Sequence, residues 1–389
     1  MTATRTGHGP DPALTDTVTA ILADHCPPAA VRDAEAGDGW APRLWDVLAE
    51  AGLPWVGVDD DAGGSGGTLP DAAEIVRLTG YAAAPVPLAD TALIAAPALA
   101  AAGLPVPSGP LAAVPRPGAL RATRDDAGWV ITGRAERVPY ARNAGHLIAV
   151  TGTADTAGTA GGGAGNSPGT GGAASGGAGA AGGPLLVRIP LRPRDGLTIT
   201  EGRDYAGEPR DTVTLTGVAV PDGDAAPYRA DGDAWRARGA LARALQIAGA
   251  LERALDLSVA HAATRVQFGR PIAAFQAVAH LIAQLGEDVA AARMAAETAA
   301  AGLAAGLPMP DVPTAKIIAG ETATRGSALA HQIHGAMGMT RECDLQLFTR
   351  RLWTWREEYG SETTWSRELG DHVTARGAPG VWPLITTAT

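Results

Sequence analysis

The 389-residue sequence is poor in cysteine, aromatic residues and lysine. Its two cysteines, Cys26 and Cys343, lie far apart and have no neighbours at metal-ligand spacing, which argues against a disulfide framework and a structural zinc site. Residues 1–10 lack the apolar core of a signal peptide, and apolar runs of membrane-spanning length are confined to Ala/Gly-rich stretches. These absences predict a soluble, cytoplasmic protein without a bound metal.

An excess of positive charge is also missing. The chain has 31 basic and 41 acidic residues, which gives a net charge of −10, and its only lysine is Lys316. This balance argues against nucleic acid as a partner. Hydrophobic residues make up 46% of the chain, enough for a sizeable core, and the length predicts two or three packed units.

Glycine, in contrast, is abundant, with 51 residues. Fourteen of them lie between Thr151 and Gly183, in a segment with one charged residue, Asp155, and no aromatic residue. Such a composition cannot bury enough apolar surface to offset the entropy lost on ordering. We therefore expect a disordered insert at 151–183 and a folded chain on either side of it.

The spacing of apolar residues divides the chain into three zones of an α+β fold. Residues 1–110 have mainly helical spacing, residues 111–228 have the two-residue period of strands, and residues 229–389 return to long helical patterns. Consecutive long helices joined by short turns are typical of a four-helix bundle. The sequence thus predicts an N-terminal helical domain, a middle β domain that holds the insert, and a C-terminal helical bundle.

The segment 265–276, RVQFGRPIAAFQ, contains the most informative polar residues. Its Gly-Arg-Pro sequence is typical of a turn between two helices, and a turn requires no ligand. The alternative is a cofactor site. The five donors of Arg265 suit a pyrophosphate, and Gln267 and Gln276 can hydrogen-bond a polar cofactor edge.

A second segment, 332–340, has the sequence QIHGAMGMT. Gly335 and Gly338 would let a ligand approach the backbone, and the amide of Gln332 both donates and accepts hydrogen bonds. The alternative is a plain helix end, because helices commonly end at glycine. His331 and His334 have no third ligand at metal-binding spacing, so we expect surface or core histidines there.

Together the two segments resemble the acyl-CoA dehydrogenase family. Its members carry an Arg-x-Gln-Phe-Gly-x-Pro-Ile segment followed by Phe-Gln, and a later Gln-x-x-Gly-Gly-x-Gly segment. Most of the chain takes part, because residues 44–88 look like the family's N-terminal helical domain and residues 129–133 and 213–220 look like its middle domain. The resemblance implies the family fold, with a β-barrel-like middle domain between two helical domains.

The resemblance also implies an FAD-dependent enzyme of fatty acid metabolism that removes the α and β hydrogens of an acyl-CoA or acyl-carrier thioester. A carboxylate takes the α proton, N5 of the flavin receives the β hydride, and an electron-transfer flavoprotein accepts the electrons. We expect a homodimer or tetramer, or a heteromer with a second dehydrogenase-like chain. The residues expected to contact the FAD phosphates and adenosine across a subunit interface are Arg265, Gln267, Phe268, Gln276, Gln332, Gly335 and Gly338.

The sequence departs from the family pattern where the catalytic base is expected. The position about 27 residues after Gln332 is Tyr359, and the nearest glutamate, Glu358, is shifted by one residue, which rotates a helical side chain by about 100°. A second base position, used by some members, falls near Gly239. In addition, Ala336 replaces one glycine of the family pattern.

The middle domain departs from the family as well. Residues 115–119 stand where the family has a Thr-Glu-Pro-x-x-Gly-Ser-Asp loop. Residues 137–140 correspond to the Trp-Ile-Thr-Asn segment that packs on the flavin ring. The sequence therefore keeps the adenosine end of the FAD site and departs around the flavin ring and the base.

Three functions are compatible with the sequence. The first is an active acyl-CoA dehydrogenase in which Glu358, or its neighbour Glu357, is a displaced base. The second is a non-catalytic or half-site subunit of a heteromeric dehydrogenase whose other chain supplies the base. The third is a flavin monooxygenase-type relative on the same fold, which needs no thioester base. For the acidic pair itself, the structural alternative is a solvated helix end.

Overall fold

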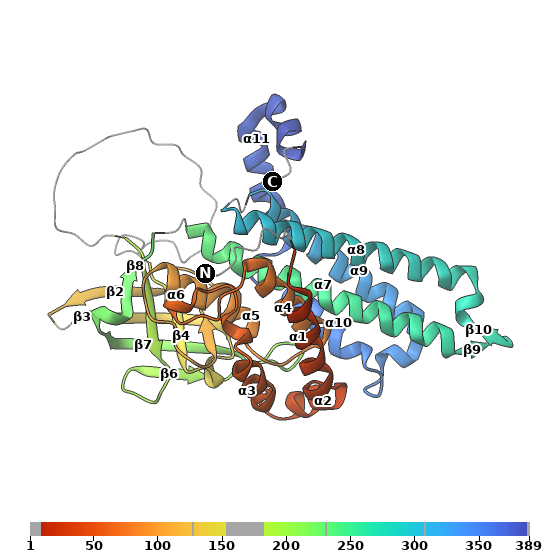
Figure 1. Ribbon diagram of the computed structural model, residues 1–389, viewed down its shortest axis with the longest axis horizontal. Coiled ribbons are helices and arrows are strands. Elements are labelled where there is room, and N and C mark those ends of the chain that lie inside the picture. Colours follow the sequence, from red (N-terminus) through yellow and green to blue (C-terminus); the bar gives the residue numbers. More distant parts are fainter. Residues whose placement is uncertain (1–8, 127, 153–182, 230–231, 307–308, 387–389) are drawn as a thin grey trace.

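A computed structural model describes residues 9–126, 128–152, 183–229, 232–306 and 309–386. These parts form a group of N-terminal helices, a β region of two sheets and a bundle of long helices (Figure 1). Most of the expected insert at 151–183 lies outside the described residues. No helix in the described part of the chain is long and apolar enough to cross a membrane.

Proline and a capping box define the starts of the N-terminal helices. The first four helices all have proline in the first turn, where a missing N–H breaks no helical hydrogen bond, and they are α1 (Pro12–His25), α2 (Pro28–Ala36), α3 (Pro42–Glu50) and α4 (Leu69–Tyr81). Thr68 caps α4 in a reciprocal capping box with Asp71. The short helix α5 (Leu88–Asp90), the π-helical turn η3 (Thr91–Ala95) and α6 (Ala96–Ala101) then follow without a break.

The β region consists of two four-stranded sheets. One has the order β1-β4-β5-β8 and the other the order β2-β3-β7-β6. Their strands are β1 (Leu111–Ala113), β2 (Leu120–Asp125), β3 (Gly128–Pro139), β4 (His146–Val150), β5 (Leu185–Pro190), β6 (Leu197–Thr200), β7 (Arg210–Val220) and β8 (Ala225–Pro227).

The first sheet is buried on both faces. On β4, Ile148 and Val150 pack into the core shared with the helices, whereas Leu147 and Ala149 pack against the second sheet. A strand with two covered faces needs apolar residues at every position, which explains the unbroken run 147–150. The second sheet shows simple alternation, with Val213 and Leu215 facing the first sheet.

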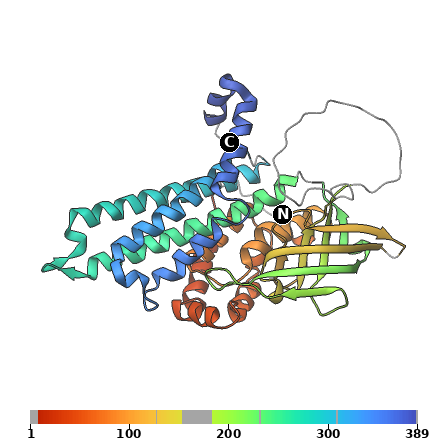
Figure 2. The same ribbon diagram turned by 180° about the vertical axis from the view of Figure 1, so that it is seen from behind.

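The C-terminal bundle contains five helices in the described part of the chain, four of which are longer than any N-terminal helix. They are α7 (Gly232–Thr264), α8 (Gln276–Ala304), α9 (Asp311–His334), α10 (Leu345–Trp355) and α11 (Glu362–Thr386), the last being interrupted at Gly377. α11 projects from the body of the molecule (Figure 1). Seen from behind, the sheets and the free end of the bundle lie at opposite ends of the molecule (Figure 2).

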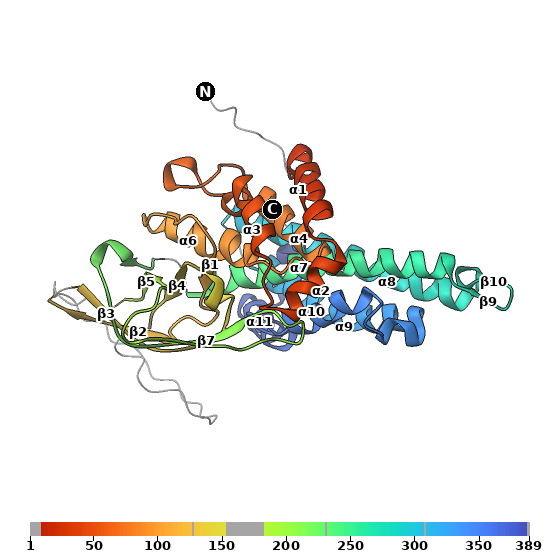
Figure 3. The ribbon, with the colours of Figure 1, turned by 90° about the horizontal axis from the view of Figure 1, so that it is seen from below.

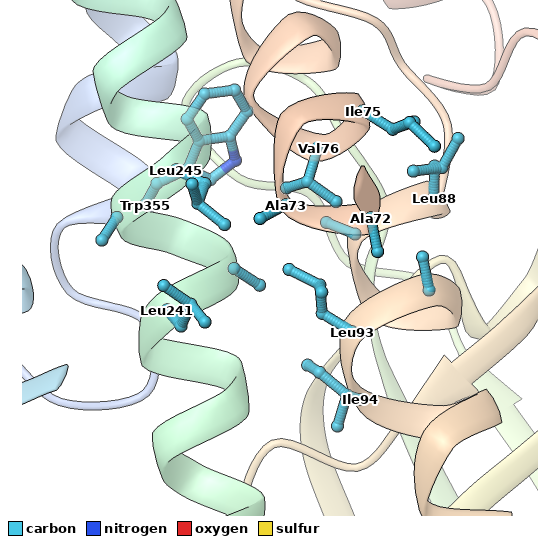
Figure 4. Close-up of a cluster of buried hydrophobic side chains, with 14 of the residues drawn as sticks. Ala72, Ala73, Ile75, Val76, Leu88, Leu93, Ile94, Leu241, Leu245 and Trp355 are labelled. Carbon is cyan, nitrogen blue, oxygen red and sulfur yellow. The ribbon is translucent and has the colours of Figure 1, made fainter. Parts of the chain in front are cut away.

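α4 and α7 are in direct backbone contact. A Cβ on Gly80 would clash with the backbone of Gln246, and a Cβ on Gly249 would clash with the backbone of Arg77. Apolar side chains from both helices, including Val76 and Leu245, fill the space beside this crossing (Figure 4). Glycine is therefore required where the N-terminal helices meet the bundle, which locks the two parts together.

Candidate functional site

A two-stranded hairpin joins α7 to α8 at the end of the bundle farthest from the sheets (Figure 3). Its strands, β9 (Val266–Gln267) and β10 (Arg270–Pro271), are antiparallel. Phe268 and Gly269 form the turn with φ angles of 49° and 79°. Two consecutive residues with positive φ are typical of a tight hairpin. The expected turn is therefore present, and it has the form of a short hairpin.

The hairpin presents an aromatic ring and three polar side chains to solvent. Phe268 is 93% exposed. Arg265, Gln267 and Gln276 are exposed as well, and within the described part of the chain none of the three has a side-chain hydrogen bond or ion pair. A guanidinium and two amides without partners fit a polar, anionic group that comes from outside the chain.

The second expected segment lies beside the hairpin. The rings of His261 on α7 and His334 on α9 stack with centroids 4.6 Å apart, which joins the ends of the two helices. The 3₁₀ turn η8 (Gly335–Met339) follows α9, and a Cβ on Gly338 would come within 2.9 Å of the His334 Cβ. Gln332 and Gly335 are exposed. The structure thus brings all seven expected FAD-contact residues to one end of the bundle.

The histidines of this region hydrogen-bond groups of the chain itself. His331 Nε2 lies 3.0 Å from the hydroxyl of Thr349, and His334 Nδ1 lies 2.9 Å from the carbonyl oxygen of Ala330. Among the described residues, no group of three or more His, Cys, Asp or Glu side chains could hold a metal ion. Both histidines therefore take part in packing and hydrogen bonding.

Glu358 is far from the hairpin. It contacts Arg243 on α7, and α7 continues from Arg243 to Thr264 before the hairpin begins. At 1.5 Å per residue, these 21 steps correspond to about 30 Å along the helix. A single chain therefore does not bring Glu358 to the end of the bundle that carries the hairpin.

Two arginines hold the carboxylate of Glu358. Arg210 Nε donates to Oε1 at 2.5 Å and Arg243 Nε donates to Oε2 at 2.6 Å. Burial by itself would raise the pKa of Glu358, but the two guanidinium charges and their hydrogen bonds outweigh it and lower the pKa to about 2. The expected base is thus a buried, doubly paired carboxylate, and such a group has little tendency to accept a proton.

Glu357, its neighbour, has the opposite environment. Its side chain is 59% exposed, against 9% for Glu358, and it lies 3.2 Å from Arg356 Nε. The structural alternative, a solvated helix end, therefore holds for Glu357 but not for Glu358.

The two positions expected for the catalytic base, Gly239 and Tyr359, pack against each other. A Cβ on Gly239 would overlap the ring of Tyr359. The Tyr359 hydroxyl donates to Asp90 Oδ1 at 3.1 Å, and its backbone has a positive φ of 56°. Burial raises the pKa of Tyr359 well above its usual value, and the Asp90 charge acts in the same direction. Neither position offers a group that takes a proton.

Further ion pairs surround Glu358 and form a group that we call the charge centre. Arg243 Nη2 lies 2.9 Å from Asp90, Arg210 Nη2 lies 3.2 Å from both Glu208 and Asp204, and Arg351 Nε donates to Glu208 at 2.9 Å. The charge centre comprises Asp90, Asp204, Glu208, Arg210, Arg243, Arg351 and Glu358. It connects the N-terminal helices, the β region and the bundle.

Lys316 supports the turn that carries Glu358 and Tyr359. Its fully buried side chain extends from α9, and Nζ donates to the carbonyl oxygens of Arg356 at 2.6 Å and Gly360 at 2.8 Å. The Arg356 carbonyl follows the last residue of α10, where carbonyl groups lack helical partners. Burial lowers the pKa of Lys316 to about 8.

Comparison with known proteins decides the family. Residues 237–364 match the family model described as the acyl-CoA dehydrogenase, C-terminal domain. The chain is also 31% identical over 341 residues to the acyl-CoA dehydrogenase IpdE2 of Mycobacterium tuberculosis, an alignment that covers 87% of this chain and 89% of the relative. The chain belongs to the acyl-CoA dehydrogenase family. The resemblance seen in the two motifs is thereby confirmed.

Solved structures show the acyl-CoA dehydrogenase fold over almost the whole chain. One chain of the ChsE4-ChsE5 complex from Mycobacterium tuberculosis superimposes with a TM-score of 0.81 at 22% identity and covers 96% of this chain and 99% of that chain. Butyryl-CoA dehydrogenase from Megasphaera elsdenii gives a TM-score of 0.77 at 19% identity, with 96% and 100% covered. The expected three-part α+β fold is therefore confirmed.

The residues of this acyl-CoA dehydrogenase family member fit one end of an FAD better than the other. At the hairpin, Arg265, Gln267 and Gln276 are exposed and have no side-chain partner among the described residues, which suits the phosphates and polar edges expected there. At the other end, Tyr140 in the segment expected at the flavin ring is buried, and its ring lies 5.9 Å from the guanidinium of Arg210. This segment therefore packs on the charge centre.

Of the residues of the charge centre, only Glu358 was expected from the sequence to have a functional role. The available signal was Arg243, which interrupts the apolar stripe of Leu241 and Leu245 on a helix expected to be buried. A fully buried arginine is normally paired with a buried acid, because an unpaired buried charge is costly. The sequence does not say which acid, because Asp90 is 153 residues away and Glu358 is 115 residues away.

Proposed function

We propose that this chain is a half-site subunit of a heteromeric, FAD-dependent acyl-CoA dehydrogenase. In this assembly its hairpin holds the phosphates and adenosine of an FAD whose flavin ring and catalytic base belong to a second dehydrogenase-like chain. The bound FAD would supply the hydride acceptor for the β carbon of the thioester. The observation that supports the proposal is that two arginines hold Glu358, whereas Arg265 has no partner among the described residues.

Removal of an α proton needs a carboxylate that is unpaired and reaches the substrate. Glu358 would have to leave both Arg210 and Arg243 to meet this requirement, and each buried arginine would then lose one of the carboxylates that neutralise it. A base on another chain avoids this cost. The structure of the ChsE4-ChsE5 complex, which contains two different chains, gives a precedent for such pairing on this fold.

The hairpin residues have distinct tasks in this proposal. The guanidinium of Arg265 pairs with the pyrophosphate, and the amides of Gln267, Gln276 and Gln332 hydrogen-bond the polar edges of the cofactor. The exposed ring of Phe268 gives an aromatic surface for stacking. At Gly335 the exposed backbone is accessible to close approach, whereas Gly338 is buried and packs on His334. Electrons would leave the assembly through an electron-transfer flavoprotein.

The test is to purify the chain alone and after co-expression with acyl-CoA dehydrogenase-like chains of its source organism. We expect flavin absorbance and acyl-CoA oxidation only in a mixed complex. In that complex, Glu358→Gln should keep acyl-CoA oxidation, measured on protein shown to be folded by circular dichroism.

Two arginines of the hairpin provide a matched pair for the cofactor contact. Arg265→Gln should weaken flavin retention by about tenfold or more, because it removes a charge-assisted contact. Arg270→Gln changes another exposed arginine, whose guanidinium lies 4.2 Å from the centroid of the Phe275 ring, and it should leave flavin retention unchanged. If the chain alone retains FAD and oxidises acyl-CoA, and Glu358→Gln abolishes that activity, the half-site proposal fails and the autonomous dehydrogenase is established.

A further inference from the structure

A pocket of about 750 Å³ lies where α6, the residues after β8, the first turns of α7 and the last turn of α8 meet. Pro97, Ala101, Trp235 and Leu303 contribute apolar surface to it. The indole N–H of Trp235 donates to the carbonyl oxygen of Val114 at 2.8 Å, so the ring offers the pocket no free donor. Sites for small organic ligands have volumes of roughly 300–1,000 Å³ and mainly apolar walls.

Arg238 lines this pocket and differs from the arginines on either side of it on α7. Arg236 forms an ion pair with Glu368, and Arg243 pairs with Asp90 and Glu358. Arg238 has no carboxylate partner among the described residues, and its Nη1 donates to the carbonyl oxygen of Leu93 at 3.2 Å. Burial lowers its pKa, and only Tyr228 acts in the opposite direction.

A half-buried guanidinium that has no carboxylate partner among the described residues destabilises the folded protein. A bound anion would remove that cost, because the planar fork of arginine takes both oxygens of a carboxylate or phosphate. Arg229, exposed at the rim of the pocket, adds a second positive charge. The described residues that line the pocket include no acidic side chain.

We propose that this pocket binds an amphipathic organic anion. Its carboxylate or phosphate pairs with Arg238, and its alkyl chain lies against Pro97, Trp235 and Leu303. The pocket lies at the start of α7, whereas the proposed FAD contacts lie beyond the end of the same helix. Binding therefore requires neither the flavin nor a partner chain, and it can be tested separately from the proposed function.

Isothermal titration of the purified full-length chain with octanoate, octyl phosphate and 1-octanol tests the site. The three probes share an alkyl chain and differ in the head group. We expect at least one of the two anions to bind one molecule per chain and to bind about tenfold or more tightly than the alcohol. The stronger anion identifies the head group as carboxylate or phosphate.

Two methionine variants on α7 separate the role of Arg238 from a general effect of charge. Arg238→Met should weaken anion binding about tenfold or more and leave the thermal stability unchanged or higher, because it removes an uncompensated charge. Arg253→Met is the control, since Arg253 is also half-buried on α7 and lies 3.4 Å from the Tyr81 hydroxyl, outside this pocket. Binding of neither anion, equal binding of the alcohol, or equal effects of the two variants would overturn the proposal.

Discussion

The hairpin and the charge centre use arginine in opposite ways, although α7 contributes to both. At the hairpin, Arg265 extends into solvent and has no partner among the described residues. In the charge centre, every guanidinium lies between carboxylates and is almost fully buried. An exposed, unpaired arginine can recognise a group from another molecule, whereas a buried, paired one holds parts of its own chain together.

This difference bears on which region carries the proposed function. In a self-sufficient dehydrogenase we would expect the exposed, reactive polar groups at the position of the base. Here they are at the end that carries the proposed FAD contacts, and the position expected for the base is filled by ion pairs and by the packing of Tyr359 on Gly239. Substitutions in one region at a time test this difference between the hairpin and the charge centre.

Removing Arg243 should have the largest effect. Arg243→Met leaves Glu358 and Asp90 buried without one of their counter-charges, and breaking a buried ion pair on one side costs about 3–5 kcal/mol. Urea denaturation should show this loss in the free energy of unfolding. If Arg243→Met unfolds like the native protein, the charge centre does not hold the three parts together.

Acid should weaken the charge centre through Glu358. Its folded pKa of about 2 lies below the ordinary value of 4.5, so its contribution is present above pH 4.5 and is lost as the pH falls towards 2. The difference corresponds to about 3 kcal/mol. Unfolding free energies between pH 5 and pH 2 should therefore fall more steeply for the native protein than for Glu358→Gln. Parallel curves would show that Glu358 is not stabilised by its arginines.

Gly239→Ala should destabilise the protein by about 1–3 kcal/mol, because the added methyl group overlaps the ring of Tyr359. Gly286→Ala on α8 is a matched control, since a Cβ there meets no atom within 4 Å. Thermal unfolding of the two variants measures the difference. Equal melting temperatures would mean that the space around Gly239 is open, which would restore it as a place for substrate.

The hairpin end should respond to pH nearer neutrality. Burial and the closeness of the two rings lower the pKa of His261, and burial lowers that of His334, below 6.5. Their stabilising contribution is present above pH 6.5 and is lost as the pH falls through the lowered values. His334→Phe keeps an aromatic ring and should reduce this loss of stability on acidification. His280→Phe on the exposed face of α8 should not reduce it.

Changing the tip of the hairpin should have the smallest effect on stability. Phe268 is 93% exposed, so Phe268→Ala should change the free energy of unfolding by no more than about 0.5 kcal/mol. The same variant should lose flavin from the mixed complex. A large loss of stability in the isolated chain would show that the ring packs on its own subunit.

The sequence predicted the regular elements because their causes are local. Thr68 caps the helix it precedes, Gly269 allows the hairpin turn, and residues 147–150 are apolar because their strand is covered on both faces. The FAD-contact segments could be found for the same reason, since each is a short run with a recognisable spacing. The two segments meet at one end of the bundle because each of the helices α7, α8 and α9 runs antiparallel to the next.

The charge centre could not be predicted because its causes are distant in sequence. Periodicity identified the apolar face of α7 but gave no partner for Arg243 on that face. Placing Glu358 one residue from the family position predicted a displaced side chain, but not that it would turn towards Arg210 on β7. Which carboxylate meets which guanidinium depends on how three separately formed parts pack, and no local pattern contains that information.

The solitary lysine gives the folded chain an unusual chemical property. Lys316 is fully buried, and its Nζ is engaged with two carbonyl groups, so reagents that acylate lysine side chains find no target until this part of the chain opens. Modification of Lys316 therefore reports the opening of the turn between Arg356 and Gly360. In lysine-directed crosslinking of a mixed complex, all lysine links on the folded assembly would come from the partner chain.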